Sequence, residues 1–525
     1  MKRILCFLLA MMLLCAIFSG CSFGDFLSGT ALTDPTSQTE QTVLPEQMQE
    51  MASEAVMNEA QRPEVLQLAY QEDYGLNPFT TVSLNNRTIL SLLYEPLFIV
   101  NSDFQPEPVL AATAEVSDDG RTTTITMRYG PKFHNGDNVT AKDVVYSYQL
   151  AKESDYYGNR FYYFESFEAI NSRTIVLKTS VSYEKAALLL DFPVVRDGTG
   201  TWAVPDGSGP FTLQGGGYQM VRYEDWWQDN WFLGYEKASL TPCTTAADIR
   251  DHYEYGQVNL VCSDPSSASY AAFHYDYELW SSPTTIMQYI GFNHNDKVFG
   301  LDAVRSAITY AINRETIVAE DLGGCAVPAT LPASPLSPCY NAGLAADYEY
   351  DMTTFRQLLG DAQIRDYTED GVLDVYVGEY SVPLEGTMIV NASSNQRVAT
   401  AQRIADYLNT AGFNITVKAL EEDDYQDALE YQNFDMYYGE LRMSNNFDMG
   451  SFFRDYGSAN FAGSANSTGL ELSLSMLENS GNGYDLHKWV MDKGWICPIL
   501  FKSYAVYTTR GAAKDLNPAV DWIIH

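Results

Sequence analysis

Residues 387–438 alternate strand-like and helix-like patterns, which constrains the fold more than any other part of the chain. Strands that alternate with helices form a parallel sheet with right-handed crossovers. Ligands bind beyond the carboxyl ends of such strands, beside helix N-termini. The expected strands cover 388–390, 415–419 and 434–438, and the expected helices begin near 398 and 425. We therefore predict binding residues just after the first and third strands: Asn391, Ser393, Ser394, Glu440 and Arg442.

The chain is too long for one hydrophobic core. With 525 residues it exceeds the usual size of a single domain, so we expect at least two lobes. Lys and Arg total 32 against 68 Asp and Glu, which gives a formal net charge of −36. This charge argues against nucleic acid and anionic membrane surfaces as partners and favours solubility outside the cell.

Residues 115–152 form a second informative stretch. Apolar and polar residues alternate with the period of a half-buried strand. Thr140 and Asp143 have the spacing of a capping box that opens a helix. The turns are expected at 118–120 and 135–137, the strand at 124–129 and the helix from Thr140 onwards.

This stretch resembles the extracytoplasmic solute-binding proteins of family 5, the receptors of peptide- and nickel-type ABC importers. In that family a Ser-x-Asp-Gly turn leads into a strand that ends in Arg. A Lys-Phe-His-(Asp/Asn)-Gly turn follows, and Thr-Ala-x-Asp-Val opens a helix. The matching positions are 117–120, Arg128, 132–136 and 140–144, and the resemblance extends over roughly residues 64–510.

The resemblance implies an α/β, bilobal periplasmic-binding-protein-like fold of type II, similar to cluster C. The first lobe would carry an extra subdomain, and two hinge crossovers would join the lobes. The implied boundaries are 63–287 for the first lobe with its subdomain at about 96–200, 288–495 for the second lobe, and 496–525 for the return. Solute would close the lobes, and the closed monomer would dock on ABC permease subunits, with no cofactor or metal.

The resemblance also bears on the solute. It places Asn77 at the family's Leu-x-Pro position and Tyr289 near the first crossover. In the family's peptide receptors, an Asp shortly after a Gly-Trp pair binds the peptide ammonium. Here Glu440 replaces that Trp, and the Asp position falls near Arg442 or Met443.

If the side chain of Arg442 faces the cleft, it favours a carboxylate or phosphate, whereas Glu440 favours an amine. Asp448, farther along, reads as a structural residue, and surface exposure of Glu440 and Arg442 is the alternative. We predict a short peptide or a related charged small solute.

The N-terminus has the features of an export signal. Lys2 and Arg3 precede an apolar run at 4–18, which is shorter than a membrane-spanning helix. Ser-Gly-Cys follows, so we expect a lipoprotein signal peptide at 1–20 and a lipid anchor on Cys21. Phe18 departs from the usual lipobox, which leaves ordinary secretion as an alternative. Residues 21–62, rich in Thr, Ser, Gln and Glu, are expected to form a flexible tether to the cell membrane.

Five further cysteines form no C-x-x-C pair, so no zinc site is indicated: Cys243, Cys262, Cys325, Cys339 and Cys497. The first two, and the next two, are close enough in sequence for disulfides in an oxidising compartment. The sequence leaves this pairing open.

Several aromatic and histidine residues have two interpretations. Trp226, Trp227 and Trp231 suit either a core or a stacking platform for sugars or peptides. His134 suits a turn better than a metal site. His294, which lies between two asparagines, is a candidate for a metal contact.

Two other functional classes compete with solute transport. An extracellular hydrolase would need a catalytic motif, yet the sequence has no Gly-x-Ser-x-Gly, His-Glu-x-x-His or phosphate loop. We therefore predict that the chain is not an enzyme. A signalling or envelope-interaction protein on the same fold, without transport, stays open as the third class.

Overall fold

The computed structural model describes residues 63–214, 216–228, 234–267, 273, 277–463, 465–478, 482–513, 516 and 518–524. The expected signal peptide, Cys21 and the tether lie outside these residues, as does Trp231. Among the described residues, no helix is both long and apolar enough to cross a bilayer. These ranges also contain no group of three or more His, Cys, Asp or Glu side chains that could hold a metal ion.

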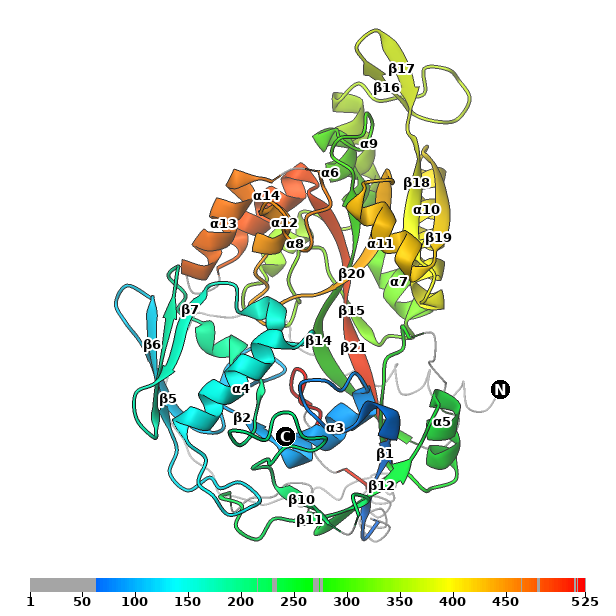
Figure 1. Ribbon diagram of the computed structural model, residues 1–525. Coiled ribbons are helices and arrows are strands. Elements are labelled where there is room, and N and C mark those ends of the chain that lie inside the picture. The colour runs from blue at the N-terminus through cyan, green and yellow to red at the C-terminus, as the bar shows by residue number, and fades with distance from the viewer. Residues whose placement is uncertain are drawn as a thin grey trace, which may run out of the picture. The chain divides into compact units, whose positions relative to one another are not determined.

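The largest sheet has 11 strands, and ten of them follow the order β10-β11-β12-β1-β13-β21-β14-β20-β18-β19 (Figure 1). The eleventh strand, β15, pairs with β21. The strands are β10 (Phe211–Gln214), β11 (Gln219–Arg222), β12 (Lys237–Pro242), β1 (Leu66–Tyr70), β13 (Leu260–Ser263), β21 (Ile496–Thr509), β14 (Tyr277–Phe292), β20 (Met436–Arg442), β18 (Glu385–Asn391), β19 (Asn414–Leu420) and β15 (Ala326–Pro328).

Two long antiparallel strands, β14 and β21, belong to both halves of this sheet (Figure 1). The C-terminal part of β21 pairs with β13, and the C-terminal part of β14 pairs with β20. We call the part that carries β1, β10–β13 and the smaller four-stranded sheet the first lobe. The part that carries β18–β20 is the second lobe. Two continuous strands therefore connect the lobes, which confirms the two expected crossovers.

The second lobe contains the parallel sheet that residues 387–438 predicted. Strand β18 pairs in parallel with both β19 and β20. Helix α10 connects β18 to β19, and α11 connects β19 to β20. The helices and the exposed hairpin of this lobe are α6 (Asp302–Ala311), α7 (Arg314–Asp321), α8 (Ala342–Ala346), α9 (Met352–Asp361), α10 (Asn395–Thr410), α11 (Glu422–Glu430), α12 (Gly450–Phe453), α13 (Ser467–Glu478), α14 (Tyr484–Lys493), β16 (Asp374–Val377) and β17 (Tyr380–Pro383).

The family motif builds the four-stranded sheet of the first lobe, in the order β5-β6-β8-β7, together with α4. The Asp143 carboxylate accepts a hydrogen bond from the Thr140 N–H at 2.9 Å, so the expected N-terminus of this helix is confirmed. The remaining elements are β2 (Glu95–Pro96), β3 (Phe98–Val100), β4 (Pro106–Pro108), β5 (Ala111–Val116), β6 (Thr122–Met127), β7 (Phe164–Ala169), β8 (Thr174–Thr179), β9 (Pro193–Val194), α3 (Leu84–Leu93), α4 (Ala141–Glu153), α5 (Ala246–Glu254), and the 3₁₀ turns Glu72–Tyr74, Gly158–Arg160 and Ala186–Leu189.

Trp226 and Trp227 belong to the scaffold. Both indole N–H groups donate to the same Glu95 oxygen, at 3.1 and 2.9 Å. The Ser208 hydroxyl donates to the other oxygen of Glu95 at 2.9 Å. His134 also has a structural contact, because its Nε2 lies 3.0 Å from the Gly209 carbonyl oxygen.

None of the five cysteines forms a disulfide, so neither expected pair is present. Cys243 belongs to a small cluster of apolar residues, whereas Cys262 belongs to the main core. Cys325 packs against the small cluster, and Cys339 lies in the main core. Each pair is thus divided between two clusters, which proximity in the sequence does not reveal.

Candidate functional site

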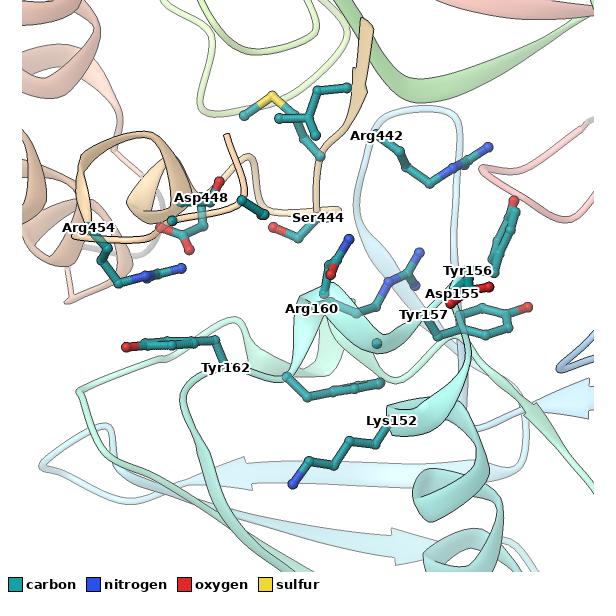
Figure 2. Close-up of a pocket in the computed structure, with 18 of the residues that line it drawn as sticks. Lys152, Asp155, Tyr156, Tyr157, Arg160, Tyr162, Arg442, Ser444, Asp448 and Arg454 are labelled. Carbon is teal, nitrogen blue, oxygen red and sulfur yellow. The ribbon is translucent and has the colours of Figure 1, made fainter. Parts of the chain in front are cut away.

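A cavity of about 580 Å³ lies between the two lobes. Residues 152–164 of the first lobe line one part, and residues 441–458 of the second lobe line the other. Figure 2 shows Asp448 and Arg454 grouped at one side and Arg442, Tyr156 and Tyr157 at the other. The charged lining residues are Lys152, Asp155, Arg160, Arg442, Asp448, Arg454 and Asp455.

Arg442, one of the predicted binding residues, ends β20 and lines this cavity. Its guanidinium donates to Asp521 and to the Tyr504 hydroxyl, both at 2.8 Å, and lies 4.5 Å from the centroid of the Tyr156 ring. Burial lowers the pKa of Arg442, but Tyr156, Tyr504 and Asp521 outweigh that effect and raise it, so the group stays charged. Its side chain is 22% exposed, which leaves part of it available to a solute.

Asp521 is the carboxylate that links Arg442, Tyr156 and Arg160 on this side of the cavity. Its Oδ1 also accepts a hydrogen bond from the Tyr156 hydroxyl at 2.7 Å, and its Oδ2 lies 3.5 Å from Arg160 Nη2. Arg160 Nη1 donates to Asp191. Burial raises the pKa of Asp521, but Arg442 and Arg160 more than offset this, so the pKa lies below its ordinary value.

The opposite wall carries Asp448 and Arg454. Arg454 donates to the Tyr163 hydroxyl at 2.8 Å, and its guanidinium lies 3.7 Å from the centroid of the Tyr162 ring. A Cβ atom at Gly450 would lie 2.4 Å from Arg454 Nη1, so the start of α12 needs a glycine for this approach. Burial raises the pKa of Asp448 above its ordinary value.

Glu440 is not among the residues that line the cavity. It lies 3.1 Å from Lys502 Nζ and accepts a hydrogen bond from Gln288 at 2.8 Å. Lys502 Nζ also lies 2.7 Å from Asp264. Because Asp264 belongs to the first lobe and Glu440 to the second, Lys502 on β21 links carboxylates of both lobes.

Asn391, Ser393 and Ser394 follow the carboxyl end of β18, as expected, but they do not line the cavity either. The Asn391 amide donates to Glu422, and Ser393 is exposed. The Ser394 hydroxyl donates to the Ser266 carbonyl oxygen at 2.6 Å. This bond joins the N-terminus of α10 to the first lobe directly.

Asn77 and Tyr289 are both buried in contacts with the protein itself. The Asn77 amide donates to the carbonyl oxygens of Gly200 and Trp202 at 2.8 and 2.9 Å. Tyr289 accepts a hydrogen bond from the Tyr437 hydroxyl at 3.2 Å and is 2% exposed. A ligand-binding role for the seven predicted residues remains a prediction, and only Arg442 lines the inter-lobe cavity.

Sequence reasoning missed most of the cavity wall. Tyr156, Arg160 and Arg454 follow no local motif, and Asp521 lies 79 residues from Arg442. Asp448 alone gives a signal, because it is an acid a few residues after the third strand, although its position favours a structural role.

A second cavity, of about 340 Å³, is lined largely by the first lobe, near the start of α3 and α5. Its lining includes Ser83, Ala246, Asp264 and Tyr504. Tyr504 also accepts the hydrogen bond from Arg442, which lines the inter-lobe cavity.

Comparison with known proteins identifies the family. The model of the bacterial extracellular solute-binding proteins, family 5, matches residues 105–463. The chain belongs to this family. As a family 5 chain, it is a solute-binding protein of the kind that serves ABC transporters, and the expected bilobal α/β fold is confirmed.

Two curated relatives and one solved structure illustrate the similarity. The oligopeptide-binding protein AppA of Bacillus subtilis is 24% identical over 370 residues, which cover 66% of this chain and 67% of AppA. The glutathione-binding protein GsiB of Salmonella typhimurium is 26% identical over 307 residues, which cover 55% of this chain and 59% of GsiB.

The crystal structure of NikA from Brucella suis in complex with Fe(III)-EDTA has a TM-score of 0.67 and 18% identity to this chain. The superposition covers 85% of this chain and 95% of NikA. This likeness bears on the fold alone.

Proposed function

We propose that this protein is the solute receptor of an ABC importer and binds a short peptide or a related charged small solute in the inter-lobe cavity. The observation that carries the proposal is a cavity of about 580 Å³ lined by both lobes, with charged groups of both signs. Its volume lies within the range of small-molecule sites, roughly 300–1,000 Å³. The relatives are named for oligopeptide and glutathione, both of which carry amino and carboxylate groups.

Closure of the lobes follows from the same geometry. A solute that contacts residues 152–164 and 441–458 together stabilises the arrangement in which both segments face it. Direct contacts already join these parts, because Asn445 donates to the Leu188 carbonyl oxygen at 2.9 Å and Arg454 to Tyr163. The closed monomer then docks on the permease subunits. We also propose the lobe boundaries expected from the sequence, after residue 287 and after residue 495. The first falls within β14 and the second just before β21.

A variant that fills the cavity tests this function. Ser451 lines the inter-lobe cavity, so Ser451→Trp should weaken solute binding by at least ~10-fold without unfolding the protein. Binding is measured as a shift in the thermal unfolding midpoint across a panel of di- to pentapeptides and metal chelates. Ala246→Trp is the matched control, because Ala246 lines the second cavity instead. Equal loss in both variants, or none in Ser451→Trp, contradicts the assignment.

We further propose that the mature chain is extracytoplasmic and anchored to the cell membrane through a lipid on Cys21. The support is the basic, apolar and Ser-Gly-Cys order of residues 2–21. Mass spectrometry of the N-terminal peptide from membranes should show an acylated Cys21, and Cys21→Ala should release the protein from the membrane fraction. Cleavage at another position with Cys21 unmodified would refute the anchor.

A further inference from the structure

The two sides of the inter-lobe cavity differ in which charged groups they offer to a solute. On the Tyr156 side, three guanidinium groups gather around two buried carboxylates: Arg87, Arg160 and Arg442 with Asp191 and Asp521. Arg87 lies 3.2 Å from the centroid of the Tyr156 ring. Two further carboxylates, those of Asp264 and Glu440, are not part of this group. Among the described residues they form ion pairs with Lys502 and not with these three guanidiniums. These five groups carry one more positive than negative charge, and the exposed carboxylate of Asp155 also lines this side of the cavity.

Arg160 is paired with two buried carboxylates, those of Asp191 and Asp521. Its side chain is 3% exposed, and its buried Nη2 atom lies 3.5 Å from Asp521 Oδ2, an atom that, like Nη2, has no hydrogen-bond partner among the described residues. The charge of Arg160 is therefore compensated within the protein, by Asp191 and Asp521 together. Arg442, in contrast, lines the cavity and is partly exposed, so its guanidinium can donate to an anionic group of a solute.

The opposite wall offers an acceptor. The Asp448 Oδ1 atom accepts both of this carboxylate's hydrogen bonds, from the Gly450 N–H at 3.0 Å and the Ser473 hydroxyl at 2.7 Å. Its Oδ2 atom accepts none from the described residues. Arg454 forms no ion pair with Asp448 in this part of the chain and contacts Tyr162 and Tyr163 instead. A cationic group in the cavity would therefore find a free carboxylate oxygen.

We propose that the cavity orients a zwitterionic solute, with its carboxylate at Arg442 and its ammonium at Asp448. This inference rests on the proposed function and adds the polarity of the bound solute. It also names an ammonium-binding residue for a chain that has Arg442 and Met443 where the resemblance to peptide receptors expected an Asp.

Capped peptides test this polarity on the unmodified protein. Isothermal titration is carried out with a pool of di- to pentapeptides with free termini, then with the same pool N-acetylated or C-amidated. Each cap removes one charged hydrogen bond, so each is expected to weaken binding by about 10- to 100-fold. Asp448→Asn should weaken binding of the free peptides by a similar factor and leave the N-acetylated pool unchanged. Asp485→Asn, exposed in the first turn of α14 and outside the cavity lining, is the matched control and should bind the free peptides as the wild type does.

The outcomes separate this inference from the function on which it rests. Free and capped pools that bind equally would overturn the polarity and leave the receptor in place. The same holds if Asp448→Asn weakens the free and acetylated pools alike, because Asp448 would then act through the fold. If no pool binds the wild-type protein, the peptide-receptor proposal fails, and the polarity fails with it.

Discussion

The Asp521→Asn variant is expected to lose about 3–5 kcal/mol of unfolding free energy, the usual cost of removing one partner from a buried ion pair. Asp521 is 2% exposed and is within 3.5 Å of two guanidiniums, those of Arg442 and Arg160. With an amide in its place, Arg160 keeps its ion pair with Asp191, whereas Arg442 keeps no ion pair among the described residues. Urea-induced unfolding followed by circular dichroism measures the loss.

Tyr156→Phe is the matched control for this variant. It removes a neutral hydroxyl that donates to Asp521 Oδ1, the oxygen that also accepts from Arg442. The expected loss of unfolding free energy is therefore only about 1 kcal/mol. A loss from Asp521→Asn no larger than that of the control would show that Asp521 does not carry the charge balance of the cavity wall.

Glu95→Gln is expected to make the protein more stable at pH 8 by about 3 kcal/mol and to flatten its stability between about pH 4.5 and 7. Burial raises the pKa of Glu95 from 4.5 to about 7, although Ser208, Trp227 and Trp226 donate hydrogen bonds to it. The folded protein therefore binds this proton more tightly than the unfolded chain does. Its contribution to stability is fully present below pH 4.5 and is lost as the pH rises to about 7, at about 1.4 kcal/mol per pH unit.

Gln keeps the shape of the side chain, and its amide oxygen can still accept both indole N–H groups, so little else changes. Thermal unfolding midpoints measured from pH 4 to pH 8 provide the comparison. Glu153→Gln, at the exposed end of α4, is the control and should reproduce the wild-type pH dependence. A Glu95→Gln profile parallel to the wild type would mean that the pKa of Glu95 is the same in the folded protein and in the unfolded chain.

Local sequence patterns predicted the elements of the fold well. The alternation at 387–438 became β18, α10, β19, α11 and β20, because period and turn residues act over short distances. The rule that ligands bind beyond parallel strands also brought Arg442 to the cavity wall. The same rule predicted Ser394 and Glu440 as binding residues, and in the structure both form contacts that link the lobes.

The partners of these side chains could not be read from the sequence. Ser394 donates to a carbonyl oxygen 128 residues earlier, and Tyr156 donates to a carboxylate 365 residues later. No spacing rule reaches over such distances, because tertiary packing alone brings these groups together. The expected disulfide pairs were wrong for the same reason, because Cys243 and Cys262 are near in sequence but lie in different apolar clusters.

Native mass spectrometry tests the central claim, that the inter-lobe cavity holds a small solute, without any choice of ligand. The wild type and Ser451→Trp are purified gently in parallel, and their masses are measured under native conditions and again after denaturation. We predict that the wild type carries extra mass that leaves as a small peptide or a peptide ladder, and that Ser451→Trp carries none. Equal extra mass in both proteins, or a wild type that stays at its bare mass in the presence of the peptide pool, would contradict the account.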